Sequence, residues 1–286
     1  RDQDPEPPGP GVVDPSGAPL LRARFALPTT PATFLRRERR RRDSRQCDDR
    51  PERFVRHAPP PLRYGADFAA LAKSYGKLGG LDRIATVIKA IRAERGDRVM
   101  FLDGGDTWQG SATSLWTNAQ DMVDAAKMLG VDVMTLHWEC TYGSDRILEV
   151  AEKDFKGKID IIAQNIKTAD FGDPVFPSHV MKTINGCKVA IIGQAFPYSP
   201  IANPRYFVKD WSYGIQEESM QEVVDEVRAK GAQVVILLSH NGMDVDLKLA
   251  SRVTGIDFIL GGHTHDGIPN AIPVKNSSGT TYVTNA

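Results

Sequence analysis

Short apolar runs rich in β-branched residues alternate with segments of helical period along most of this chain, and this alternation constrains the fold most. The expected strands are 98–106, 131–139, 159–166, 232–242 and 256–267, and one more begins at 280–286. The expected helices are 81–96, 118–130, 144–157, 214–231 and 244–255. Residues 179–196 favour a hairpin that turns at Asn185-Gly186. Strands that alternate with helices in this way predict a layered α/β domain whose sheet is buried between helices.

The first 65 residues differ in composition from the rest of the chain. They contain 14 arginines, no lysine and 12 of the 19 prolines, whereas residues 66–286 contain 8 arginines and 14 lysines. Two interpretations of residues 1–65 stay open: a disordered basic tail, or a stretch translated in the wrong frame from a GC-rich gene. Neither gives it a fold. We therefore place the folded domain at 66–286, and we interpret its end inside an apolar run as a C-terminal truncation.

The overall composition argues against several classes of protein. The formal net charge is zero, so no global field favours nucleic acid as a partner. No apolar run reaches the roughly 18 residues that a membrane-spanning helix needs, so we expect no membrane insertion. The three cysteines lack metal-like spacing and give neither a disulfide framework nor a zinc motif.

Side chains that can bind metal ions follow four of the predicted strands. They are Asp106, His137, His240 and the pair His263 and His265. Because open α/β sheets carry their sites at the carboxyl ends of the strands, we expect these five side chains to converge. The other two histidines have no such position, and we interpret them as ordinary hydrogen-bonded residues.

Imidazole and carboxylate ligands suit a borderline cation such as Mn, Fe or Zn. Two such ions, about 3.5–4 Å apart, would form the two-metal arrangement that activates a water for in-line attack. An imidazole nitrogen cannot span two cations, so Asp106 is the expected bridging ligand.

A lone strand-end aspartate is more often a turn or helix cap. For His263 and His265 the ordinary explanation is weaker, since residues i and i+2 of an extended segment point the same way.

The blocks GGDTWQGS, LSHNG and GGHTHDG, in this order and spacing, resemble the calcineurin-like metallophosphoesterases and, within them, the 5′-nucleotidase branch. This resemblance implies a sheet sandwich flanked by helices. A fourth block departs from the family: the nucleotidases have Asn-His-Glu-Phe-Asp where this chain has His137-Trp138-Glu139-Cys140-Thr141. By that alignment His137 replaces a ligand asparagine, Trp138 replaces the histidine that protonates the leaving group, and Thr141 replaces the aspartate that orients it.

The His-Trp-Glu variant resembles the SoxB family of thiosulfohydrolases, from about Phe68 to Ala286. This resemblance implies a dimanganese hydrolase of the periplasmic Sox sulfur-oxidation system, which releases sulfate from a cysteine S-thiosulfonate on the carrier protein SoxYZ. Its persulfide leaving group is more acidic than an alcohol, so no general acid is required. Two alternatives stay open: a 5′-nucleotidase-type phosphoesterase that manages without the histidine, and a catalytically silent metal-binding or interaction domain.

Two parts of the family pattern are missing from this chain. The Asp-x-His pair that supplies two ligands should lie near the start, where only Asp2-Gln3-Asp4 comes close. The family's separate C-terminal domain, which helps to form the substrate cleft, is also missing. We therefore expect the chain as written to have an incomplete, inactive site, and we predict function for the intact parent.

Four further residues are candidates for roles around the metals. Trp138 is expected to line the cleft. Arg146 is expected either to pair with a sulfonate through its forked donors or to cap its own helix. Asn165 is expected either to contact substrate oxygens or to cap a turn. Glu139 is expected to orient one of the ligands from behind.

Overall fold

The computed structural model describes residues 73–74, 80–268 and 270–285, so both interpretations of residues 1–65 lie outside it. The α-helices are α2 (Leu81–Arg95), α3 (Ala112–Trp116), α4 (Gln120–Leu129), α5 (Ser144–Glu149), α6 (Ser199–Ala202), α7 (Glu217–Ala229) and α8 (Met243–Arg252). Shorter turns are the 3₁₀ segments η3 (Trp138–Tyr142) and η5 (Arg205–Phe207) and the π segment η4 (Val150–Asp154). Within the described residues, no helix has the length and apolar character needed to cross a membrane.

The strands form two main sheets and one short pair. They are β1 (Leu102–Asp103), β2 (Val133–Met134), β3 (Asp160–Ile161), β4 (Lys167–Thr168), β5 (His179–Ile184), β6 (Cys187–Gln194), β7 (Trp211–Ser212), β8 (Val234–Ser239), β9 (Phe258–Gly261), β10 (Ile272–Asn276) and β11 (Gly279–Asn285). The smaller sheet has the parallel order β1-β2-β3. The larger, mixed sheet has the order β10-β11-β9-β8-β6-β5.

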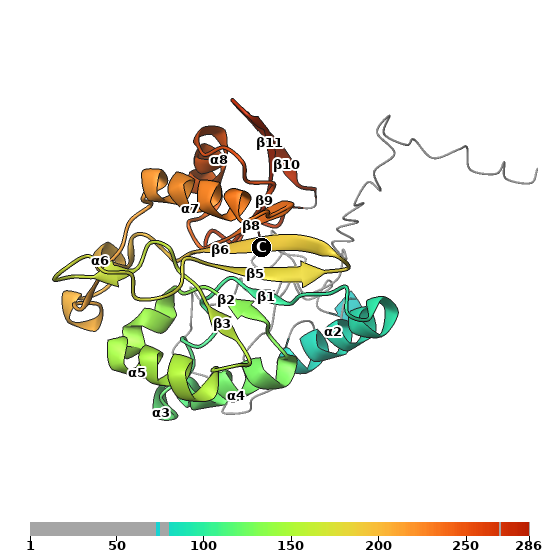
Figure 1. Cartoon of the computed structure of the whole chain (residues 1–286). Coiled ribbons are helices and arrows are strands. Elements are labelled where there is room, and N and C mark those ends of the chain that lie inside the picture. Colours follow the sequence, from blue (N-terminus) through green and yellow to red (C-terminus); the bar gives the residue numbers. More distant parts are fainter. Residues whose placement is uncertain (1–72, 75–79, 269, 286) are drawn as a thin grey trace, which may run out of the picture.

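The two sheets pack face to face, with helices on both outer sides (Figure 1). One apolar cluster lies between the sheets and comprises Val133, Ile162, Val189, Ile191 and Leu238. A second cluster joins α4 and α5 to the smaller sheet, and a third joins α7 and α8 to the larger one. The expected sheet sandwich flanked by helices is confirmed.

Strand β6 shows why this sequence forms a sheet that is buried on both sides. Its residues alternate between the faces: Val189 and Ile191 pack between the sheets, while Ala190 and Ile192 pack against the helices. Both faces are apolar, as expected for a strand with a parallel neighbour and covered surfaces. The hairpin between β5 and β6 turns where predicted, because Asn185 and Gly186 both have the positive φ (50° and 77°) that a two-residue type I′ turn requires.

The predicted strands before the polar residues are too long. Strand β2 ends at Met134, and residues 138–142 form a 3₁₀ turn rather than the end of a strand. Beyond this point the backbone N–H of His137 donates to the carboxylate of Glu139 and not to a neighbouring strand. Strand β10 was not predicted, since Pro273 interrupts its apolar pattern; an edge strand tolerates that proline.

Candidate metal centre

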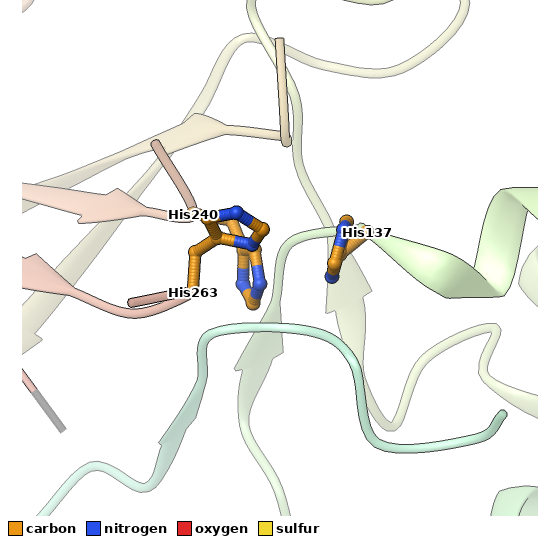
Figure 2. A group of neighbouring side chains, drawn as sticks. All are labelled: His137, His240 and His263. Atoms are coloured by element: carbon orange, nitrogen blue, oxygen red, sulfur yellow. The ribbon is translucent and has the colours of Figure 1, made fainter. Parts of the chain in front are cut away.

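Three of the predicted ligands lie together where the two sheets meet: His137 follows β2 of the smaller sheet, and His240 and His263 follow β8 and β9 of the larger one (Figure 2). One ring nitrogen from each histidine lies within 4.8 Å of those of the other two. The rings of His137 and His240 stack with centroids 4.3 Å apart, and His263 stands edge-on to His137 at 5.0 Å. The fold therefore brings together three side chains that are far apart in the sequence.

Asp106 lies beside this group. Its Oδ1 is 3.7 Å from Nδ1 of His137, and both side chains are buried. His265 does not belong to the three-histidine group. The expectation that His263 and His265 lie on an extended segment is wrong, because β9 ends at Gly261 and the φ angles of His263 and His265 are 83° and 59°. The role of His265 as a ligand stays a prediction. The segment is a turn and not an extended strand, so the alternation of side chains does not apply.

The backbone around these residues adopts an unfavourable conformation. Among the described residues, seven other than glycine have positive φ, and three of the seven are the predicted ligands Asp106, His263 and His265. Positive φ costs about 1–2 kcal/mol for an L-residue, and it persists only where the surroundings enforce it. Such strain is concentrated at functional sites, which supports a functional role for this edge of the sheets.

Gly105 lets the Asp106 turn approach the end of β2. A Cβ at this position would lie 2.7 Å from the carbonyl oxygen of Thr135 and 3.2 Å from the backbone nitrogen of His137. We expect Gly105→Ala to lower the free energy of unfolding by about 3 kcal/mol, from positive φ and this clash. Gly157→Ala is the matched control, since Gly157 also has positive φ (72°) but has no atom near its Cβ position. Chemical denaturation measures both, and equal losses would show that the close approach is unimportant.

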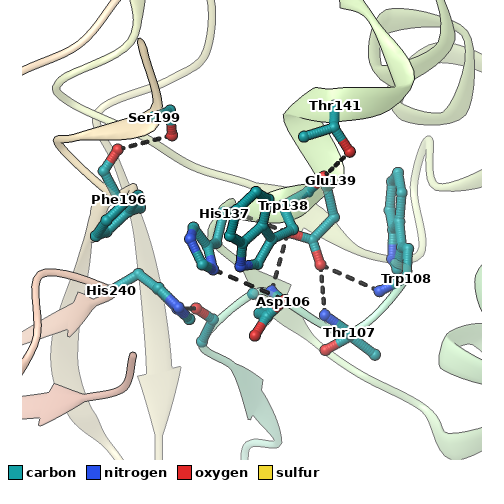
Figure 3. Close-up of polar contacts among 12 residues, drawn as sticks. Asp106, Thr107, Trp108, His137, Trp138, Glu139, Thr141, Phe196, Ser199 and His240 are labelled. Atoms are coloured by element: carbon teal, nitrogen blue, oxygen red, sulfur yellow. Dashed lines mark hydrogen bonds and ion pairs between the residues drawn. The ribbon is translucent and has the colours of Figure 1, made fainter. Parts of the chain in front are cut away.

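The carboxylate of Glu139 accepts hydrogen bonds from the two segments that follow β1 and β2 (Figure 3). Its Oε2 accepts the backbone N–H groups of Asp106 at 2.9 Å and of His137 at 2.8 Å. Its Oε1 accepts those of Thr107 at 2.5 Å and of Trp108 at 3.2 Å. The side chain is fully buried. One carboxylate thus fixes the turns that carry two predicted ligands, in agreement with the orienting role expected for Glu139.

The tautomer of His240 follows from its hydrogen bond. Nδ1 lies 2.5 Å from the carbonyl oxygen of Gly104, a group that can only accept. Nδ1 therefore carries the proton, and Nε2 is the nitrogen that can bind a metal ion. Three imidazoles at this spacing with a carboxylate beside them form a suitable donor set for a divalent cation. The residues fit a metal ion, although their role as ligands stays a prediction.

Two aromatic rings pack against the histidines. Trp138 lies beside His137 with ring centroids 4.9 Å apart, consistent with its expected place at the site. The ring of Phe196, which follows β6, lies 4.4 Å from that of His137 and 4.1 Å from that of His263. Phe196 was not predicted from the sequence, because an aromatic residue after an apolar strand looks like ordinary core.

The other two proposed substrate contacts have structural partners. The guanidinium of Arg146 donates to the carbonyl oxygen of Asn118 and to the side chains of Gln120 and Glu149, which favours a structural role over pairing with a sulfonate. Asn165 connects the sheets: its Nδ2 donates to the carbonyl oxygens of Ala195 and Gly214, and its Oδ1 accepts the N–H of Ala195. These bonds favour a structural role for Asn165 over substrate contact.

A chain of buried polar side chains runs beneath the centre from the smaller sheet to helix α8. Gln164 donates to Gln194 at 2.7 Å, Gln194 donates to Asn241 at 3.0 Å, and Asn241 donates to Asp246 at 3.0 Å. All four side chains are buried. Sequence reasoning missed Gln194 and Asp246, because single polar residues in an apolar strand or helix have no periodic signal; only the place of Gln194 at a strand end could have indicated it.

Burial raises the pKa of Asp246 to about 7, from an ordinary value of 3.8. Because of this raised pKa, the native state keeps a proton on Asp246 that the unfolded chain releases. The free energy of unfolding therefore has its full value below about pH 4 and falls as the pH rises toward 7. Between pH 5 and pH 7, we expect the free energy of unfolding of the metal-free protein to fall by about 2–3 kcal/mol more than that of the Asp246→Asn variant. Chemical denaturation at both pH values measures this, and the exposed Asp244→Asn is the control. Parallel pH profiles for the protein and Asp246→Asn would contradict the raised pKa.

No family model matches the chain. Snake venom 5′-nucleotidase from Naja atra is 28% identical over 205 residues, which cover 69% of this chain and 37% of that protein. The solved structure of a sulfate thiohydrolase SoxB from Thermus thermophilus is 37% identical, with a TM-score of 0.70, over 77% of this chain and 40% of that one. The chain belongs to the 5′-nucleotidase/calcineurin-like phosphoesterase superfamily.

A further member of this superfamily, a 5′-nucleotidase precursor that is also from Thermus thermophilus, is 26% identical with a TM-score of 0.60. It matches 73% of this chain and 43% of its own chain. The present chain therefore spans about two fifths of the length of these superfamily members.

Proposed function

We propose that this chain is the metal-binding domain of a dimetal hydrolase that releases sulfate from a cysteine S-thiosulfonate on a sulfur carrier protein. The 37% identity to a sulfate thiohydrolase SoxB supports this choice, against 26% for a 5′-nucleotidase precursor. The three-histidine group and Asp106 would hold the ions, for which we propose manganese. Bound cations would supply Lewis-acid activation of the hydrolytic water.

The main support for this proposal is the residue at the position expected for a general acid, Trp138. Trp138 lies directly beside His137, at the place that the nucleotidase pattern gives to a proton-donating histidine. The hydroxyl of Thr141, at the place of the orienting aspartate, donates to the carbonyl oxygen of Trp138 at 2.7 Å. An indole does not titrate, so this pair cannot protonate a leaving group. The site therefore suits a substrate whose leaving group departs as a stable anion.

A thiosulfonate meets that requirement. The oxygen of water bonds to the terminal sulfonate sulfur and its two protons pass to solvent, while the S–S bond breaks and its electron pair leaves with the persulfide sulfur. The persulfide stays on the carrier cysteine, and the sulfonate, with the oxygen gained from water, is released as sulfate. An alcohol leaving group would instead need a proton at this point, which general acid catalysis normally supplies with a 10²–10⁴-fold gain in rate.

The partner and compartment follow from the same proposal. The carrier would be SoxYZ. The location would be the periplasm, where the Sox system operates. Both depend on the SoxB assignment.

A 5′-nucleotidase-type phosphoesterase is the second candidate function. The curated relative from Naja atra is a 5′-nucleotidase, and the same group of histidines would serve phosphate esters. The comparison that separates the two uses the complete protein loaded with Mn²⁺. We expect sulfate release from the S-thiosulfonate form of a carrier protein, measured by ion chromatography, and little phosphate release from AMP. Turnover of AMP without sulfate release would overturn the proposal, and turnover of neither substrate would favour a catalytically silent metal-binding domain.

A further inference from the structure

Helix α8 carries a fully buried carboxyl group, Asp246, for which the proposed reaction has no use. Its Oδ1 accepts two hydrogen bonds, from Oγ of Ser239 at 2.7 Å and from Nδ2 of Asn241 at 3.0 Å. These two residues flank His240 in the chain. The Ser239 hydroxyl also accepts the backbone N–H of Asn241 at 3.2 Å, which closes a small ring of bonds behind His240.

The other oxygen of Asp246 faces the strand that leads to His263. A Cβ placed on Gly261, the last residue of β9, would lie only 2.6 Å from Oδ2 of Asp246. The beginning of α8 also holds the turn itself, since the backbone N–H of Met243 donates to Oγ1 of Thr264 at 3.0 Å. Asp246 therefore lies between the two backbone segments that carry His240 and His263.

We propose that Asp246 is a positioning residue that sets the spacing between His240 and His263, and thereby the affinity of the centre for divalent metal ions. Its place in the larger sheet parallels that of Glu139 in the smaller one. Each is a buried carboxyl group that accepts hydrogen bonds next to predicted ligands: Glu139 from the backbone N–H groups of Asp106 and His137, and Asp246 from the two side chains that flank His240. The buried chain from Asn241 through Gln194 to Gln164 connects the two halves.

The acceptor geometry, and not a negative charge, performs this function. The causes of the raised pKa of Asp246 are burial, which dominates, and the opposing hydrogen bonds from Ser239 and Asn241; no charged group contributes. Below neutral pH the group is a neutral carboxylic acid, and asparagine is its isostere with an oxygen that can accept the same two bonds. Leucine fills a similar volume but leaves both donors without an acceptor, which is costly in a buried site.

The test measures metal binding by the full chain at pH 6 through titration with Co²⁺, whose visible absorption reports the ligand geometry. We expect Asp246→Asn to bind Co²⁺ within about threefold of the parent, with the same spectrum. We expect Asp246→Leu to bind at least about tenfold more weakly, with an altered spectrum, as when the residues supporting metal ligands are lost. Asp244→Asn, on the exposed side of the same helix, is the control and should change nothing.

Two results would overturn the proposal. One is a folded Asp246→Leu that binds Co²⁺ like the parent with an unaltered spectrum, and the other is an equal loss of affinity in Asp246→Asn and Asp246→Leu. Should Asp246→Leu fail to fold, Ser239→Ala removes one of the two donors with a small change of volume. It should weaken binding by about threefold or more, and parental affinity would overturn the proposal. The test uses no substrate, so its outcome does not depend on whether the proposed sulfate-releasing reaction is correct.

Discussion

Glu139→Gln is expected to lower the free energy of unfolding by about 3 kcal/mol or more and to weaken Mn²⁺ binding by about 10–100-fold. Each carboxylate oxygen accepts two backbone N–H groups, from Asp106 and His137 on one side and from Thr107 and Trp108 on the other. A glutamine amide keeps one of these oxygens and turns an NH₂ group toward the other two donors. Two buried N–H groups then lose their acceptor whichever way the amide is placed.

Chemical denaturation of the metal-free chain and titration with Mn²⁺ measure the two effects of Glu139→Gln separately. Glu152→Gln makes the same chemical change at an exposed position and should alter neither quantity. Parental Mn²⁺ affinity in a destabilised Glu139→Gln would mean that Glu139 supports the fold without positioning Asp106 and His137.

Trp138→His combined with Thr141→Asp is expected to raise the hydrolysis of AMP by the complete protein by at least about tenfold, toward the 10²–10⁴-fold that a general acid supplies. The pair restores the residue types of the nucleotidase pattern beside His137, where the indole now lies. AMP has an alkoxide leaving group that needs a proton. p-Nitrophenyl phosphate has a stabilised leaving group, so its hydrolysis should rise much less.

Thr141→Asp alone is the control for this pair, since an aspartate without the histidine has nothing to orient. The kcat for both esters, measured with Mn²⁺ at several pH values, should show a new titration only in the double variant. An unchanged ratio of AMP to p-nitrophenyl phosphate turnover would contradict the assignment of Trp138 to the position of the acid.

The alternation of strand and helix patterns was sufficient for the layers of this fold. Helices α2, α4, α7 and α8 begin and end within a few residues of their predicted bounds, since amphipathic period and terminal glycines such as Gly96 and Gly130 are local signals. The helix predicted at 144–157 is instead the short α5 followed by the π segment η4. The predicted hairpin at Asn185-Gly186 was also local, because positive φ at two adjacent residues is a property of those residues. The strands of the smaller sheet were predicted too long, since β-branched composition does not indicate where hydrogen-bonded pairing stops.

The candidate site was only partly predictable. Asp106, His137, His240 and His263 were indicated by their chemistry and their place after strands, and they do converge. The segment with His263 and His265 was expected to be extended and is a turn, because a sequence pattern does not reveal that β9 ends at Gly261, six residues before the expected end at 267. Hydrogen bonds across the sheets, such as those of Asn165, have no sequence signal because their partners are distant in the chain.

By itself, the sequence determined the kinds of element, their order and the residue types at the strand ends, since these depend on local propensity and apolar period. Only the tertiary structure decided which of those residues face one another. The two sheets meet along buried apolar side chains, and this contact carries His137 from one sheet to His240 and His263 of the other. Buried carboxyl groups at Glu139 and Asp246 then hold the turns in place. Such placement depends on contacts between distant segments, which exist only once the chain is folded.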